Sequence, residues 1–260
     1  MSIAEQILRA KADYDEVYAS GYEKGKAEGG DTEAAYNEGV EAGKQAERDR
    51  FWDTYQDYGN RAEYGYAFGG IGWVKTDLLP PKYPIILNNF IVGNYGIFRD
   101  FNKSATTRYD MTEICRLLDC SNAVRLNGMF SNSCVENVTI DMSNCQVAND
   151  MFSCNMGGGD IDKIYLKVTE KLTSASSMFA SCNKLETIRF TEDSVINVAL
   201  SFAQSSKLTD ESVDSIVNAL KDLTGATSKT LTVHATVYDR MVELGKDALV
   251  TAKNWILAKA

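Results

Sequence analysis

The sequence predicts an α/β fold: a short solenoid of stacked coils with parallel strands, an N-terminal helical segment and a C-terminal α/β cap. Three observations indicate this. A bulky pair of residues ending in phenylalanine recurs at nearly constant spacing, an alternating apolar pattern follows each copy, and both patterns stop near residue 207. Because one coil cannot bury its apolar row alone, such coils must stack to form a core.

The pair that ends in phenylalanine defines the repeat. Successive phenylalanines are 22, 27 and 23 residues apart, and a period in the low twenties is the length of one leucine-rich-repeat coil. A glycine run at 157–159 accounts for the longer step as a loop insertion, and Phe98 marks an earlier, degenerate copy. The clearer copies are Met129-Phe130, Met151-Phe152, Met178-Phe179 and, more weakly, Ser201-Phe202.

The stretch after each phenylalanine predicts a short strand with alternate residues inward, preceded by a turn that inserts one more apolar residue. Residues 114–120 fit this pattern less cleanly. Aligning Asp119 with Asp141 would turn Arg116 inward, so the assignment of this stretch stays open. The pattern is clear over residues 135–142, 161–168 and 185–190.

Shifts in composition divide the chain into four predicted regions. Helical periodicity marks residues 1–58 as an attachment or oligomerisation segment. Residues 59–94 are rich in aromatic residues, glycine and proline, and we predict a linker and N-terminal cap there. The solenoid occupies residues 95–207, and the C-terminal cap occupies residues 208–260.

The two flanking regions carry further expectations. In the C-terminal cap, Thr209 is expected to cap a helix, followed by a strand at 230–233, a helical turn or two, and a closing segment at 255–257. At the other end, short acidic helices cannot bury their apolar stripe alone. We therefore expect a homo-oligomer formed through the N-terminal helices.

Composition excludes several classes of function. The chain carries 27 Lys and Arg against 36 Asp and Glu, a net charge of −9, which argues against binding to nucleic acid or to an anionic membrane surface. No apolar stretch is long enough to span a bilayer, so no membrane insertion is expected. The single histidine, His234, leaves no multi-histidine metal site, and we predict that it is structural or solvated rather than catalytic. We predict no cofactor, no metal and no catalytic residue.

The cysteines are predicted to be buried free thiols. They fall within one region of a long chain, show no CxxC spacing, and lie among apolar or small residues, which disfavours both disulfides and a zinc site. The six are Cys115, Cys120, Cys134, Cys145, Cys154 and Cys182.

The repeat also defines an exposed surface. Residues between the inward positions must point out of the sheet, so stacking brings side chains of successive coils into lateral rows. An aromatic ring flanked by Lys and Arg can contact a carbohydrate or an acidic protein patch, which makes these rows the candidate ligand-binding site. The alternative is that a solvated sheet face simply needs polar residues. One row is Thr139, Tyr165 and Arg189, and the next is Asp141, Lys167 and Thr191.

Three motifs carry a resemblance to a known family. The Met-Phe-x-x-Cys/Asn signature, the Leu-x-x-Ile-x-Phe strand and the Asp-x-Ser-Asn turn resemble bacterial surface-antigen-type (BspA-like) leucine-rich repeats over roughly residues 95–257. The N-terminal segment is similar to those ahead of such repeats in phage-encoded virion proteins. The resemblance implies an adhesin or binding scaffold without enzymatic activity.

The residue pattern and the family resemblance together give the expected function. We expect a non-enzymatic binding or structural protein, a phage tail or appendage component or a surface adhesin, made in the cytoplasm and acting on a virion or cell exterior. The N-terminus lacks a classical signal peptide, which a virion protein released by lysis does not need. Expected partners are a protein or carbohydrate on a cell surface, or neighbouring virion proteins, and a phage appendage would be a trimer. The alternatives are a glycan-acting enzyme using carboxylates on the repeat face, such as Asp141, and an intracellular protein-interaction scaffold.

Overall fold

The computed structural model describes residues 37–46, 48–49, 85–86, 98–155 and 157–260. Residues 37–46 and 48–49 are helical, and they belong to a different compact unit from the other described residues. The rest of the predicted N-terminal helical segment lies outside the described residues. The same holds for the predicted linker, except for residues 85–86.

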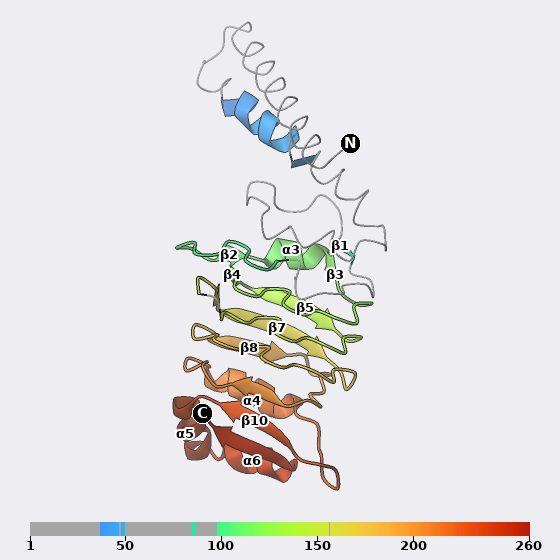
Figure 1. Ribbon diagram of the computed structural model, residues 1–260, viewed down its shortest axis with the longest axis vertical. Coiled ribbons are helices and arrows are strands. Elements are labelled where there is room, and N and C mark those ends of the chain that lie inside the picture. Colours follow the sequence, from blue (N-terminus) through green and yellow to red (C-terminus); the bar gives the residue numbers. More distant parts are fainter. Residues whose placement is uncertain (1–36, 47, 50–84, 87–97, 156) are drawn as a thin grey trace, which may run out of the picture. The chain divides into compact units, whose positions relative to one another are not determined.

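The second unit is a mixed α/β structure in which the paired strands run parallel (Figure 1). Among the described residues the sheets have the orders β2-β4-β6, β5-β7-β8 and β11-β10-β9, and β1 pairs with β3. The strands are β1 (Ile85–Ile86), β2 (Tyr109–Asp110), β3 (Leu118–Asp119), β4 (Cys134–Glu136), β5 (Val138–Met142), β6 (Asp160–Ile161), β7 (Lys163–Val168), β8 (Thr187–Phe190), β9 (Leu200–Phe202), β10 (Lys229–Val233) and β11 (Trp255–Lys259). The helices are α3 (Thr112–Leu117), α4 (Asp210–Ala219), α5 (Ala235–Glu243) and α6 (Lys246–Ala252).

Sheet β5-β7-β8 has one buried and one exposed face, as the alternating pattern predicts. In β5 the apolar residues Val138, Ile140 and Met142 are buried, and the two residues between them are exposed. The predicted apolar stretch 135–142 is divided between two strands, however. Asn137 lies between β4 and β5 with a φ of 57°, a left-handed conformation that Asn tolerates better than most residues, so the chain bends there.

The recurring phenylalanines form one continuous buried stack. Five rings follow one another, with centroids 5.2 Å apart for Phe98 and Phe130, 5.6 Å for Phe130 and Phe152, 5.6 Å for Phe152 and Phe179, and 4.6 Å for Phe179 and Phe202. Neighbouring planes are within 23° of parallel, and each of the five residues is at most 1% exposed. The phenylalanines of the predicted repeat thus line up in one buried interior, including the degenerate copy at Phe98.

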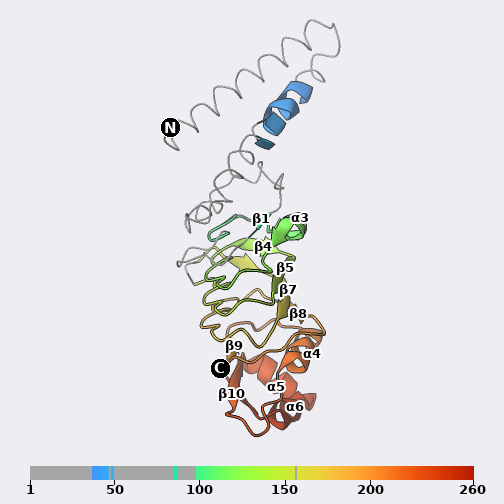
Figure 2. The ribbon, with the colours of Figure 1, turned by 90° about the vertical axis from the view of Figure 1, so that its right-hand side faces the viewer.

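Backbone hydrogen bonds hold the stacked rings at this spacing. The amide of Phe130 donates to the carbonyl of Met151 at 2.7 Å, and the amide of Phe152 donates to that of Met178 at 2.9 Å. Successive units therefore lie one strand spacing apart, about 4.8 Å. Figure 2 shows the corresponding loops lying one beside the next.

The stretch at 114–120, which the sequence left open, begins as a helix. Residues Thr112–Leu117 form α3, and Arg116 points to solvent, where it pairs with Glu113 at 2.9 Å. The alignment of the two turns holds nevertheless. Asp119 accepts the amide of Ser121 at 2.9 Å, just as Asp141 accepts that of Ser143 at 2.8 Å.

Helix α4 closes sheet β5-β7-β8 at the edge of β8. The predicted cap is confirmed: the hydroxyl of Thr209 accepts the amide of Ser212 at 3.2 Å. The free edge of β8 is satisfied by two serine hydroxyls of α4, since Ile188 donates its amide to Ser212 at 3.1 Å and Phe190 donates its amide to Ser215 at 2.8 Å. An unpaired strand edge would otherwise be open to another chain.

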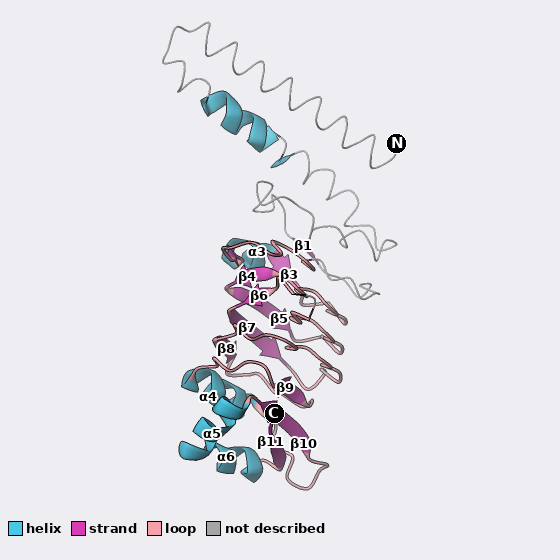
Figure 3. Ribbon diagram, turned by 60° about the vertical axis from the view of Figure 1, so that its left-hand side comes forward, coloured by secondary structure: helices cyan, strands magenta, loops and turns pink. Residues whose placement is uncertain are grey.

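The C-terminal cap contains more helix than predicted. The predicted strand at 230–233 is present within β10, but two helices, α5 and α6, replace the expected helical turn or two, and residues 255–259 form strand β11. His234 has a structural role, as expected, because its ring nitrogen accepts the amide of Thr236 at 3.2 Å and caps α5. Figure 3 shows α4, α5 and α6 gathered beside β10 and β11.

We predict that Phe152→Ala lowers the free energy of unfolding by about 3–5 kcal/mol, because the change removes a fully buried ring and its stacking contacts with Phe130 and Phe179. Urea denaturation measures the loss. Phe190→Ala is the matched control: Phe190 is only partly buried, so its loss should be clearly smaller. Equal losses for the two variants would argue against the stack as the main source of stability.

Candidate functional site

The structure brings the predicted surface residues together on the exposed face of sheet β5-β7-β8. Thr139 pairs with Tyr165, and Tyr165 pairs with Arg189, so the first predicted row is confirmed as a set of neighbours. In the second row Asp141 pairs with Lys167. Thr191 follows directly after β8, and its amide donates to the carbonyl of Leu166 at 3.0 Å, which places it next to Lys167.

Tyr165 is the aromatic side chain of the predicted rows. It is 37% exposed, and it is the one aromatic among the exposed large hydrophobic side chains of the described residues. Thr139 beside it is exposed, and Arg189 on its other side is partly exposed. A tyrosine ring with one face free can stack on a sugar ring or receive an apolar side chain, while its hydroxyl stays hydrated.

The cation in the second row is already paired. The Lys167 ammonium lies 2.7 Å from the Asp193 carboxylate. The hydrogen bond from Lys167, with a second from Thr191, lowers the pKa of Asp193, and the same bond to Asp193 raises the pKa of Lys167. Asp141 is also engaged, because its carboxylate accepts the amide and the hydroxyl of Ser143.

Arg189 differs from Lys167. Within the part of the chain that the structure describes, no carboxylate lies within ion-pair distance of its guanidinium. Its charge reaches Glu211 only as a secondary influence: hydrogen bonds from the backbone amide of Glu211 and from Thr209 lower the pKa of that carboxyl, and Arg189 adds to the effect. The aromatic ring of Tyr165 therefore lies next to the guanidinium of Arg189, which has no ion-pair partner among the described residues.

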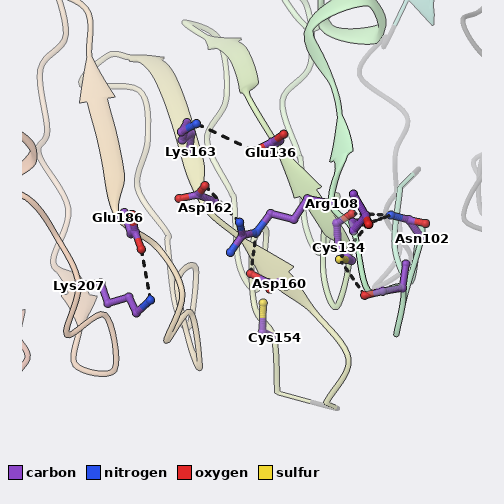
Figure 4. Close-up of polar contacts among 12 residues, drawn as sticks. Asn102, Arg108, Cys134, Glu136, Cys154, Asp160, Asp162, Lys163, Glu186 and Lys207 are labelled. Carbon is purple, nitrogen blue, oxygen red and sulfur yellow. Dashed lines mark hydrogen bonds and ion pairs between the residues drawn. The ribbon is translucent and has the colours of Figure 1, made fainter.

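A row of carboxylates, which the sequence analysis did not single out, borders this face. Asp110 pairs with Glu136 across β2 and β4, and Asp162 and Glu186 occupy the corresponding position immediately before β7 and β8. Cations oppose them, since Lys163 approaches Glu136 at 4.0 Å and Lys207 approaches Glu186 at 3.2 Å (Figure 4). The signal that could have revealed the row is the recurrence of an acidic residue at one position of the repeat.

Arg108 is the centre of this row. Its guanidinium donates to Asp160 at 2.9 Å and to Asp162 at 3.4 Å (Figure 4). These two residues lie 52 and 54 positions after Arg108 in the sequence. Burial opposes the charge of Arg108, but the hydrogen bond to Asp160 and the charges of Asp160, Asp162 and Glu136 outweigh it and raise the pKa of the guanidinium. Asp162 is only 7% exposed, so Arg108 supplies the cation that this buried carboxylate requires.

This cluster acts as a clamp between units rather than as a metal centre. Arg108 immediately precedes β2, whereas Asp160 begins β6 and Asp162 lies between β6 and β7, so one side chain links segments of different repeats. Among the described residues, no group of three or more His, Cys, Asp and Glu side chains is arranged to hold a metal ion. The Arg108 clamp is therefore a structural contact made by residues other than those of the predicted binding rows.

None of the described helices combines the length and the apolar character that a bilayer crossing needs. No family model, no curated protein and no solved structure matches the chain. The residues themselves therefore carry the functional argument.

We predict that Arg108→Met lowers the free energy of unfolding by about 1–3 kcal/mol, because it leaves the buried carboxylate of Asp162 without a cation. Chemical denaturation at neutral pH measures the loss. Arg116→Met is the matched control: the Arg116–Glu113 pair is exposed, and its removal should change stability by about 0.5 kcal/mol or less. Equal effects would show that the Arg108 clamp contributes no more than a surface pair.

We also predict that Lys167→Met raises the pKa of Asp193 toward its ordinary value, as measured by an NMR titration of the side-chain carboxyl. Because folding lowers this pKa, the ion pair favours the native state above the ordinary pKa of Asp, and the contribution is lost as the pH falls through the folded-state value. Asp222 is the control. Hydrogen bonds from Thr224 lower its pKa, and its titration should stay unchanged in the variant.

Proposed function

We propose that this protein is a non-enzymatic binding protein with a leucine-rich-repeat-type solenoid, and that it recognises its partner with the exposed face of sheet β5-β7-β8. In this proposal it is a phage tail or appendage component, or a surface adhesin, displayed by its N-terminal helices. The stacked phenylalanines at 22, 27 and 23 residue steps, with parallel strands between them, support the repeat architecture.

The observation that carries the binding proposal is the Tyr165–Arg189 pair. A solvated sheet face needs only polar side chains, whereas Tyr and Arg are the residue types enriched among those that contribute most to binding. An adjacent arginine without a carboxylate partner within the described residues offers a donor fork for an anionic or polar ligand. These properties fit a cell-surface glycan or an acidic patch of a protein.

The enzymatic alternative receives less support from this face. Glycoside hydrolysis usually needs two carboxylates at a set separation around the bond that breaks. Asp141, the residue expected to serve there, uses its carboxylate to accept hydrogen bonds from Ser143, and its neighbour across the strands is Lys167. The intracellular scaffold alternative would use the same face and differs only in where the protein acts.

We predict that Tyr165→Ala and Arg189→Ala each weaken binding at least about tenfold, which corresponds to about 1.4 kcal/mol per residue. The full chain is immobilised and screened against a panel of neutral and acidic bacterial polysaccharides and of acidic proteins. Arg125→Ala is the matched control, because Arg125 is exposed and lies in the loop bridges outside this sheet. Wild-type affinity in both variants would contradict the proposed binding surface. Release of sugar products would support the enzymatic alternative.

The proposed attachment role of the N-terminal helices has its own test. Light scattering of the full chain gives its mass in solution. An oligomer, and a trimer in particular, supports the display of the binding face in several copies. A monomer at micromolar concentration would contradict self-association through the helices, while the binding measurements above would stand unaffected.

A further inference from the structure

We propose that Cys154 and Cys182 form an oxidative modification site, in which a peroxide joins the two thiols in a disulfide that links successive repeat units. The inference stands independently of the proposed binding function. It rests on the placement of the two sulfur atoms, on the spacing of the backbone segments that carry them, and on the different surroundings of the other four cysteines.

The two thiols converge on one acceptor. The Cys182 thiol donates to the carbonyl oxygen of Phe152 at 3.0 Å, and the Cys154 thiol approaches the same oxygen at 3.6 Å. The two thiols are also close enough for each to shift the pKa of the other. The sulfur atoms are thus neighbours, although 28 positions separate the two residues in the sequence.

The backbone spacing matches what a disulfide needs. The amide of Cys154 donates to the carbonyl of Ala180 at 2.8 Å, so the segments that carry the two cysteines lie side by side as hydrogen-bonded neighbours. A second link between them joins the hydroxyl of Ser181 to the side-chain oxygen of Asn155 at 2.8 Å. This register places Cys154 opposite Ser181, so Cys182 is offset by one residue. A lateral spacing of about 4.8 Å and an offset of about 3.3 Å put the two Cα atoms about 6 Å apart, within the range of about 4.4–6.8 Å that a disulfide adopts.

The other cysteines, all of which lie in the described part of the chain, have different hydrogen-bond partners or are more deeply protonated. The Cys134 thiol donates to the carbonyls of Ala105 and Thr107, and the Cys145 thiol donates to that of Val147. The Cys115 sulfur accepts the amide of Thr139. Burial raises the pKa of Cys115 and Cys145 to about 11 and that of Cys120 still higher, which keeps these thiols protonated and unreactive.

The two thiols of the pair have unequal roles. The hydrogen bond from Cys182 lowers the pKa of Cys154, and the same interaction, with burial, raises the pKa of Cys182. Cys154 is also the more accessible of the two, at 7% exposure against 1%. Cys154 is therefore the nucleophile that meets the oxidant, and Cys182 is the residue that resolves the product.

The reaction balances in two steps with hydrogen peroxide as the oxidant. The Cys154 thiolate attacks one peroxide oxygen, the O–O bond breaks, and protonation of the leaving hydroxide gives water and a sulfenic acid on Cys154. The sulfur of Cys182 then attacks the Cys154 sulfur, its proton leaves with the sulfenic hydroxyl as a second water, and the S–S bond forms. Two thiols are oxidised by two electrons, and one peroxide is reduced to two waters.

The test uses the full chain treated with stoichiometric hydrogen peroxide, then denatured, alkylated and digested without reduction. The expected result is four alkylated cysteines out of six and one cross-linked peptide pair that contains Cys154 and Cys182. The oxidised protein should also melt about 6–12 °C higher than the reduced one, since the bond restricts the unfolded chain. Six free thiols after treatment, or a cross-link between other cysteines, would overturn the proposal.

Two variants test the order of the steps. In Cys182→Ser the sulfenic acid on Cys154 has no resolving thiol, so dimedone should label Cys154. In Cys154→Ser no cross-link and no dimedone adduct on Cys182 should form. Cys120→Ser is the matched control, because Cys120 is equally buried and should leave the cross-link intact. Dimedone labelling of Cys182 in the Cys154→Ser variant would contradict the assigned roles, and the peptide map of the wild-type protein decides the main proposal even where a variant folds poorly.

Discussion

The spacing of the buried phenylalanine rings governs the second unit of this protein. Ring centroids 4.6–5.6 Å apart are compatible with backbones about 4.8 Å apart, so the parallel hydrogen bonds and the ring stack impose the same repeat distance. Neither would be stable alone: isolated short strands lose too much chain entropy, and stacked rings need a backbone that holds them face to face. Each segment that carries one of these phenylalanines therefore depends on the neighbouring segments for a core.

A stack of this kind must end somewhere, and its end must satisfy both the rings and the strand edges. Phe202 belongs to β9, so the last ring of the stack lies within the sheet that β10 and β11 continue. On the other side of the unit, the serine hydroxyls of α4 accept the amides at the edge of β8. The two sides thus end differently, one by further strand pairing and the other by a helix.

The exposed face inherits its order from the buried one. Because side chains alternate along each strand, burial of one residue directs its two neighbours to the exposed face. The parallel register of the three strands then places Tyr165 between Thr139 and Arg189. The polar contacts then differentiate the face. Lys167 is neutralised by Asp193, whereas Arg189 has no such partner among the described residues, and this difference directs the proposed ligand toward the Tyr165 side.

Much of this arrangement could be predicted from local patterns. The ring stack, the alternation of β5, β7 and β8, the Thr209 cap and the lateral row through Tyr165 all follow from periodicities of two and of about two dozen residues. Asn137 escaped prediction, because a single left-handed residue divides a strand without disturbing the apolar pattern. Helix α3 did as well, since six residues are too few to show a helical period.

The sequence by itself determined the phenylalanine repeat, its buried rings and the direction in which each strand residue points, because these depend on alternation within one strand and on similar segments that pair in parallel register. Only the tertiary structure decided the partners of individual side chains. Arg108 meets Asp162, and Cys154 meets Cys182, across units whose separation in the chain varies with loop insertions. Such contacts depend on the distance between atoms in space, which residue spacing along the chain does not encode.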